Sequence, residues 1–140
     1  MRFSYECVSC GYASVRTVPA HTSILTLIVV DDDENIRRAF GRLLRSHGHD
    51  VHLFESAEDC LARHDEADCA ILDIGLPGLN GIELQKRLHT SHGKIPVVFV
   101  TARDEPPILA AVRRSGCQFL KKPVDEQMLL AAIERAVHGS

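Results

Sequence analysis

From Ile24 onward, short apolar stretches alternate with longer amphipathic ones, and this alternation restricts the possible folds more than any other feature of the sequence. The apolar stretches are rich in β-branched residues and mostly lack the polar alternation of half-exposed strands. Each therefore predicts a strand that is buried on both faces. They are LTLIVV (25–30), DVHLF (50–54), CAILDI (69–74), IPVVFVTA (95–102) and CQFLKKP (117–123).

The segments between these stretches have the spacing and the end signals of helices. In the first segment, four apolar side chains share one face at helical spacing, and Gly48 follows as a terminator. Ser56 precedes the second segment as an N-cap, with Asp59 three residues later in a capping-box arrangement. The predicted helical segments are 34–48, 56–64, 81–93, 106–116 and 125–139.

Five strands that each lead into a helix predict an α/β fold, with a doubly wound, five-stranded parallel sheet that carries helices on both faces. We place this domain at residues 24–140, a length that can bury a core of its own. Residues 1–23 show neither helical nor strand periodicity. They are predicted to form a disordered N-terminal tail.

Composition argues against several classes of function. The net charge is −3 and basic residues never form a block, which disfavours direct binding to nucleic acid. The longest strongly apolar run, ILTLIVV, is too short to span a bilayer, and residues 1–20 lack the apolar core of a secretory signal. The five cysteines are irregularly spaced and do not indicate a disulfide framework. We expect a reduced, cytoplasmic protein.

Polar residues stand at the ends of four predicted strands. Asp31 and Asp32 follow the first strand, Asp73 belongs to the end of the third, Thr101 to the fourth and Lys122 to the fifth. In a doubly wound sheet, ligands bind at the carboxyl ends of the strands, which share one edge. We therefore expect three carboxylates, a hydroxyl group and an ammonium group to converge on one shallow pocket.

Carboxylates gathered in this way need a cation. Two of them within about 4 Å oppose each other by roughly 4 kcal/mol at an effective dielectric near 20. Oxygen ligands of this kind suit Mg²⁺, which usually adds phosphate oxygens and waters to one or two carboxylates. The chemistry indicated is phosphoryl transfer onto Asp73, since a carboxylate can act as a nucleophile toward phosphorus. Mg²⁺ and Lys122 would reduce the repulsion between the two anions, and Thr101 can donate to a phosphoryl oxygen.

The motifs IVVDDDENIRR, AILDIGLPGLNGIEL, VVFVTA and FLKKP resemble the receiver domain of two-component response regulators. The likeness covers residues 24–138, with its landmarks in order and at suitable intervals. It implies the flavodoxin-like (βα)5 receiver fold with strand order 2-1-3-4-5. It also implies a phosphorylated signalling switch instead of an enzyme, with catalysis limited to its own phosphotransfer and dephosphorylation.

The resemblance assigns a role to each metal-site position. Asp73 would be the phosphoacceptor and also a Mg²⁺ ligand. Asp32 would bind Mg²⁺ directly and Asp31 through a water molecule. Gly75, two residues past the phosphoacceptor, would contribute its backbone carbonyl. Together, these positions imply a Mg²⁺ cofactor.

The resemblance also implies a switch. Lys122 would pair with the phosphoryl group and form a cis bond to Pro123. Thr101 would move toward the phosphoryl group, and Phe119 would turn inward behind it. Positions Gly75 and Arg103 are those at which side chains tune phosphate lifetime in the family. The Gly75 position is expected to leave the path of an attacking water open, and whether Arg103 covers that path is not decided by the sequence.

Two kinds of partner follow from the resemblance. A sensor histidine kinase or phosphotransfer protein would supply the phosphoryl group. A downstream protein would bind the face formed by the fourth helix, the fifth strand and the fifth helix. Homodimerisation is left open. No direct contact with nucleic acid or membrane is expected.

Two alternatives to a stand-alone receiver have to be weighed. The chain could be the N-terminal receiver fragment of a longer DNA-binding transcription regulator, which the length of the native reading frame would decide. A phosphatase of the haloacid-dehalogenase type also uses an aspartate and Mg²⁺, but it needs an Asp-x-Asp motif and a cap. Asp31 and Asp33 have that spacing only because the acids form a run. Labelling would separate the two activities, at Asp73 for a receiver and at Asp31 for the phosphatase.

Two further groups of metal-binding residue types occur in the chain. Cys7 and Cys10 form half of a zinc-knuckle pattern, but four-coordinate zinc needs two more ligands and no second such pair exists. Tail residues without a metal are the simpler interpretation. The histidines of HGHDVH (47–52) are explained more simply by a helix end that turns into a strand than by a metal site.

Overall fold

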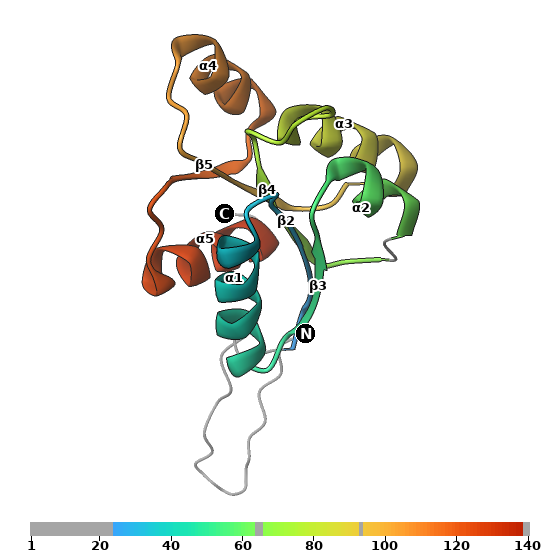
Figure 1. The fold of residues 1–140 in the computed structure, drawn as a ribbon, viewed down its shortest axis with the longest axis vertical. Helices are drawn as coiled ribbons and strands as arrows, with labels where there is room; N and C mark the ends of the chain where they lie inside the picture. The colour runs from blue at the N-terminus through green and yellow to red at the C-terminus, as the bar shows by residue number, and fades with distance from the viewer. Residues whose placement is uncertain (1–23, 64–65, 93, 139–140) are drawn as a thin grey trace, which may run out of the picture.

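The computed structural model describes residues 24–63, 66–92 and 94–138 (Figure 1). The predicted N-terminal tail, with Cys7 and Cys10, lies outside the described residues. Within them, a central sheet carries helices on both faces, which is the predicted α/β arrangement.

All neighbouring strands of the sheet pair in parallel, in the order β3-β2-β4-β5-β6. The first of the five predicted strands therefore lies between the second and the third, which confirms the order 2-1-3-4-5. The winding direction reverses between β2 and β4, so the carboxyl ends of these two strands form the crevice where doubly wound folds bind ligands. The strands are β2 (Thr26–Val30), β3 (Asp50–Phe54), β4 (Cys69–Asp73), β5 (Val97–Thr101) and β6 (Gln118–Lys121).

The helices form two layers. Side chains of α1 and α5 pack with one set of strand residues, and side chains of α2, α3 and α4 pack with the other set. Each layer buries the apolar stripe that the sequence predicted, and the buried Leu, Ile, Val and Phe side chains contribute roughly 1.5–3 kcal/mol each. The helices are α1 (Glu34–Ser46), α2 (Ala57–Arg63), α3 (Gly81–His92), α4 (Pro106–Ser115) and α5 (Glu126–His138).

Burial differs between central and edge strands. Every residue of β4 and β5 is buried, as continuous apolar runs predict. The edge strands β3 and β6 alternate or are only partly covered, because each has a neighbour on one side only. The predicted strands were also too long by up to three residues, so that Lys122 lies just beyond β6 instead of within it.

The helix ends follow the predicted signals. The side chain of Ser56 accepts the N–H of Asp59 at 3.0 Å, as a cap does. Asp33 is the N-cap of α1, and its carboxylate accepts the N–H groups of Asn35 and Ile36. In the C-cap of α4, Gly116 has φ +72°, a left-handed conformation that favours glycine.

Candidate functional site

Three carboxylates converge at the carboxyl end of the sheet. Asp31 directly follows β2, and Asp73 is the last residue of the adjacent strand β4. Together with Asp32 they offer oxygens that all lie within 4.8 Å of one another. Asp31 and Asp73 are only 2% and 6% exposed, whereas Asp32 is exposed to solvent. Two of the charges are therefore held away from water, where their repulsion is largest.

The ammonium group of Lys122 lies against both buried carboxylates. Its Nζ is 3.0 Å from Asp31 Oδ2 and 3.4 Å from Asp73 Oδ2. The backbone N–H of Lys122 donates to the carbonyl of Thr101 at 2.9 Å, which fixes the residue beside the end of β5. The peptide bond from Lys122 to Pro123 is cis, as the sequence resemblance implied.

The backbone and a neighbouring helix hold Asp31 in place. Its N–H donates to the carbonyl of Phe54 on β3, and its Oδ1 accepts the N–H of Asp33 at 2.9 Å. Its own carbonyl accepts the guanidinium of Arg37, a residue of α1, at 2.8 Å. The carboxylate can therefore direct Oδ2 toward Lys122 without reorganising.

The charged form of the Asp73 carboxyl group is disfavoured. Its Oδ1 accepts the N–H of Gly75 at 3.0 Å. Burial raises the pKa of Asp73 above its ordinary value, and the charge of Asp31 raises it further. The hydrogen bond from Gly75 and the charge of Lys122 oppose this shift but do not cancel it. A further cation near Asp73 would favour the ionised form.

Lys122 remains protonated in this environment. Burial by itself would lower its pKa, but the hydrogen bond and charge of Asp31 and the charge of Asp73 outweigh that effect. The net result is a pKa above the ordinary lysine value. A permanent positive charge thus faces the two buried carboxylates.

Thr101 and Phe119 lie behind this cluster. Thr101 is fully buried at the end of β5, and its Oγ1 accepts the N–H of Arg103 at 3.0 Å. Its hydroxyl is thus engaged with the backbone of the loop after β5. Phe119 pairs in register with Phe99 and is half-buried beside a pocket that α4 also lines. Phe119, which lines this pocket, therefore has space beside it.

The loop after Asp73 is tied to α2 and lies beside Arg103. Glu58 of α2 accepts the N–H of Leu79 at 3.2 Å, which anchors the loop from outside. A Cβ atom at Gly75 would lie 3.6 Å from Cδ of Arg103, so the arginine stem runs directly past this glycine. Its Nε pairs with Glu105 at 3.4 Å. Arg103 therefore lies beside the loop that follows Asp73.

The donor set fits a hard divalent cation. The three carboxylates supply oxygens at mutual distances that one ion can span, and one of them, Asp32, is open to solvent. Mg²⁺ keeps several waters and takes few protein carboxylates, so a half-open site of this kind suits it. Among the described residues, this is the only group of three or more His, Cys, Asp or Glu side chains within such reach.

The histidines near residue 50 do not form such a group. His49 accepts the N–H of Leu25 at its Nδ1, and His47 pairs with Glu126 at 3.3 Å. Burial and the neighbouring His47 lower the pKa of His49. These contacts fit the interpretation of a helix end that turns into a strand.

Sequence reasoning missed Arg37 and Glu58. Both act through backbone groups, the carbonyl of Asp31 and the N–H of Leu79 respectively. Such partners leave no residue-type signal, because every non-proline residue has both groups.

Comparisons with known proteins indicate one family. A family model described as "Response regulator receiver domain" matches residues 27–134. Nodulation protein W of Bradyrhizobium diazoefficiens is 36% identical over 122 residues, which cover 83% of this chain and 54% of that protein. Protein PilH of Pseudomonas aeruginosa is 34% identical over 118 residues, 81% of this chain and 98% of that protein. The chain thus spans about half of one relative and nearly all of the other.

Solved structures show the same fold. The response regulator StyR is 40% identical, with a TM-score of 0.73 over 81% of this chain and 59% of that chain. A receiver domain protein (CheY-like) from Methanospirillum hungatei is 25% identical, with a TM-score of 0.77 over 84% of this chain and 96% of that chain. Within the described residues, no helix has the length and apolar character needed to cross a membrane.

Proposed function

Because the chain belongs to the response regulator receiver domain family, we propose that it accepts a phosphoryl group on Asp73 and thereby switches a partner-binding face. The observation that carries the proposal is the position of Lys122. Its ammonium group contacts both Asp31 and Asp73, residues that are 91 and 49 positions away in the sequence. Phosphoryl transfer requires a cation close to the nucleophilic carboxylate. Lys122 and Asp73 are in contact although they are far apart in the sequence.

The transfer itself involves one bond made and one bond broken. An oxygen of Asp73 attacks the phosphorus of a phosphohistidine on the partner kinase, and a P–O bond forms. The P–N bond breaks, and its electron pair returns to the imidazole of the partner. Lys122 offsets the negative charge that gathers on the equatorial oxygens during this exchange. Its raised pKa keeps this charge available at neutral pH.

Asp31, Asp32 and Asp73 would hold Mg²⁺, together with the backbone carbonyl of Gly75. The bound ion would supply charge neutralisation between the carboxylate and the phosphoryl oxygens. Burial and the charge of Asp31 disfavour the ionised form of Asp73, and a bound cation would offset this effect. A nucleophilic carboxylate must be ionised to attack.

Phosphorylation would be transmitted through Thr101 and Phe119. The hydroxyl of Thr101 exchanges its bond with the N–H of Arg103 for one to a phosphoryl oxygen. The space released lets Phe119 turn inward from its half-buried position next to α4. The face formed by α4, β6 and α5 changes as a result, and a downstream protein binds the changed face. Phosphorylation thus shifts the population from the inactive to the active conformation.

The partners in this scheme are a histidine kinase or phosphotransfer protein and a downstream target, in the cytoplasm. Relatives such as FixJ of Bradyrhizobium diazoefficiens, named a transcriptional regulatory protein, extend well beyond the segment that matches this chain. PilH is matched over 98% of its length. The proposal therefore concerns the receiver domain, either acting alone or as the input of a longer regulator.

Labelling with acetyl phosphate tests the proposal. The wild-type protein is expected to gain one phosphoryl group in the presence of Mg²⁺, and peptide mass spectrometry should place it on Asp73. Asp73→Asn should gain none. Label on Asp31 would overturn the proposal in favour of a phosphatase-type mechanism, and undiminished labelling of Asp73→Asn would overturn it outright.

Asp33→Asn provides a matched control. The substitution removes a charge from the same run of acids, and asparagine caps a helix as well as aspartate does. Labelling should therefore be retained. In a haloacid-dehalogenase-type phosphatase, by contrast, Asp33 would be the second acid of the motif, and its loss would be severe.

A further inference from the structure

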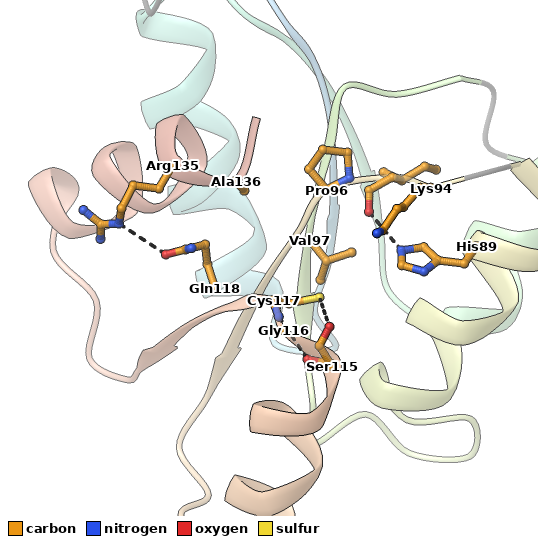
Figure 2. A pocket seen from close by; sticks show the side chains of 11 residues that line it. His89, Lys94, Pro96, Val97, Ser115, Gly116, Cys117, Gln118, Arg135 and Ala136 are labelled. Atoms are coloured by element: carbon orange, nitrogen blue, oxygen red, sulfur yellow. Dashed lines mark hydrogen bonds between the residues drawn. The ribbon is translucent and has the colours of Figure 1, made fainter. Parts of the chain in front are cut away.

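A second concave site lies at the end of the sheet opposite to the carboxylates (Figure 2). Val97 and Gln118, the first residues of β5 and β6, line it, whereas the carboxylate cluster lies at the other ends of the strands. The end of α3, the α4–β6 turn and the last turns of α5 complete its walls. Its volume is about 450 Å³, which is within the range of small-molecule sites, about 300–1,000 Å³.

Several polar groups of the pocket are already satisfied. His89 uses one ring nitrogen with the amide of Gln85 and the other with the carbonyl of Ile95, each at 3.2 Å. The hydroxyl of Ser115 donates to the carbonyl of Val112 and accepts the N–H of Cys117. These groups shape the pocket but have little capacity left for a ligand.

Most of the remaining side-chain hydrogen-bonding capacity belongs to donors. Nε of Arg135 donates to Oε1 of Gln118 at 3.2 Å, and this fixes the orientation of the amide. The NH₂ group of Gln118 and the terminal NH₂ groups of Arg135 are then left as donors. Lys94 adds an exposed ammonium group that forms no ion pair with any described residue. A ligand for such a pocket must bring acceptor oxygens.

The charge of the pocket is unbalanced. Two of its residues, Lys94 and Arg135, are permanent cations, and none of the described residues that line it carries a carboxylate. Burial raises the pKa of the Cys117 thiol, so this group stays neutral and adds no negative charge. Positive charge in a concave site concentrates the field and favours anions.

The floor of the pocket is apolar. Figure 2 shows Arg135 and Gln118 on one side, Lys94 on the other, and Pro96 and Val97 between them. An inorganic ion would leave this floor uncovered. A molecule with an organic body and an acidic group can satisfy the floor and the donors together.

We propose that this pocket binds a small organic phosphate, with its phosphate oxygens at Arg135, Gln118 or Lys94 and its organic body on Pro96 and Val97. The binding itself does not depend on the proposed function. A consequence that does rest on the proposed function concerns the switch. The ligand would connect β6 to α5 through Gln118 and Arg135, within the partner-binding face, so binding and phosphorylation should influence each other reciprocally.

Titration of the ¹⁵N-labelled full chain with three organic phosphates tests the binding. Adenosine monophosphate, ribose 5-phosphate and glycerol 3-phosphate are the probes, with adenosine and inorganic phosphate as comparison ligands. At least one probe should shift the amide signals of Val97, Cys117 and Gln118 saturably at millimolar concentration. It should bind about tenfold more tightly than the comparison ligands, because adenosine lacks the phosphate that the donors bind and inorganic phosphate lacks the organic body.

Variants locate the site. At least one of the variants Arg135→Gln and Lys94→Gln should weaken binding several-fold, while Arg114→Gln, which removes an exposed charge from the last turn of α4 outside this pocket, should not. Circular dichroism verifies the fold of each variant. Absence of saturable shifts with all three probes, equal binding of inorganic phosphate, or unchanged binding by Arg135→Gln and Lys94→Gln would each overturn the proposal. Acetyl phosphate labelling of Asp73 is scored separately, so failure of either proposal is recognised independently.

Discussion

Gly81 lies directly against the backbone of Asp73. A Cβ atom built at Gly81 would be 2.5 Å from the carbonyl oxygen of Asp73 and 3.0 Å from Cα of Ile74. The N–H of Gly81 also donates to the carbonyl of Ile74 at 3.3 Å. The start of α3 is thus packed on the end of β4, and the absence of a side chain at residue 81 allows this packing.

Gly81→Ala should therefore lower the free energy of unfolding by about 1–3 kcal/mol, the usual cost of forcing extra atoms into a packed site. Helix propensity alone would favour alanine by up to about 1 kcal/mol, so a loss can be assigned to the clash. Urea unfolding measures the difference. Gly75→Ala is the control, because its Cβ would make ordinary contacts at 3.6 and 3.7 Å and should change stability by less than about 1 kcal/mol. A gain in stability for Gly81→Ala would contradict the packing.

The raised pKa of Asp73 predicts that Asp73→Asn stabilises the protein at neutral pH in the absence of divalent cations. Between the ordinary carboxyl pKa and the raised one, the folded protein binds more protons than the unfolded chain. Wild-type stability therefore falls as the pH rises through that window, and the full penalty of burying the charge applies above it. Asparagine carries no such charge.

Denaturant unfolding over a pH series measures this effect. The advantage of Asp73→Asn over wild type should be largest at neutral pH and should shrink as the pH falls below the raised pKa. Asp33→Asn, which replaces an exposed carboxylate and keeps its cap, should change stability less. A variant that is less stable than wild type at neutral pH would show that Lys122 and Gly75 more than compensate the burial of the Asp73 charge.

The sheet and its polar edge were predictable because both depend on periodic patterns. Continuous apolar runs predict buried parallel strands, and parallel strands have their carboxyl ends on one edge of the sheet. Asp31, Asp73 and Lys122 were therefore expected together although they are far apart in the sequence. The same argument predicts the burial of the edge strands less well, because one side of each edge strand has no neighbouring strand.

The features that the sequence did not reveal depend on the positions of individual atoms, which residue types do not indicate. In a run of four acids, nothing in the residue types distinguishes Asp33, which caps α1, from Asp31, which is buried. The residue at which α1 begins determines which of the acids is the N-cap. Arg37 was not singled out because its partner is a backbone carbonyl. The pocket around Lys94 and Arg135 combines four separate segments, none of which carries a motif.

Mg²⁺ should stabilise the folded protein through the carboxylate cluster. At ten times its dissociation constant, a ligand that binds only the folded state adds about 1.4 kcal/mol. Thermal unfolding should therefore occur at a higher temperature with Mg²⁺, and excess chelator should reverse the change. Asp32→Asn should lose most of the stabilisation, whereas Asp33→Asn should keep it. A full Mg²⁺ effect in Asp32→Asn would exclude Asp32 as a ligand.

Arg37 and Arg38 are adjacent on α1 but have different partners. Nη1 of Arg37 donates to the carbonyl of Asp31 at 2.8 Å in a partly buried position. Arg38 pairs with Glu34 at 2.7 Å, with both side chains more than half exposed. A charged donor to a partly buried carbonyl is worth about 1.5–3 kcal/mol, whereas an exposed helix pair contributes about 0.3–0.5 kcal/mol.

Arg37→Met should therefore destabilise the protein by about 1–3 kcal/mol and weaken Mg²⁺ binding, because the methionine keeps an apolar stem but cannot hold the turn that carries Asp31. Arg38→Met should change stability by less than about 0.5 kcal/mol and leave Mg²⁺ binding as it is. Urea unfolding with and without Mg²⁺ measures both quantities on the two variants. If the two variants lost equal stability, the hydrogen bond from Arg37 to Asp31 would stabilise the fold no more than the exposed pair of Arg38 and Glu34 does. If Arg37→Met lost stability but kept its Mg²⁺ affinity, Arg37 would support the fold without positioning the metal ligands.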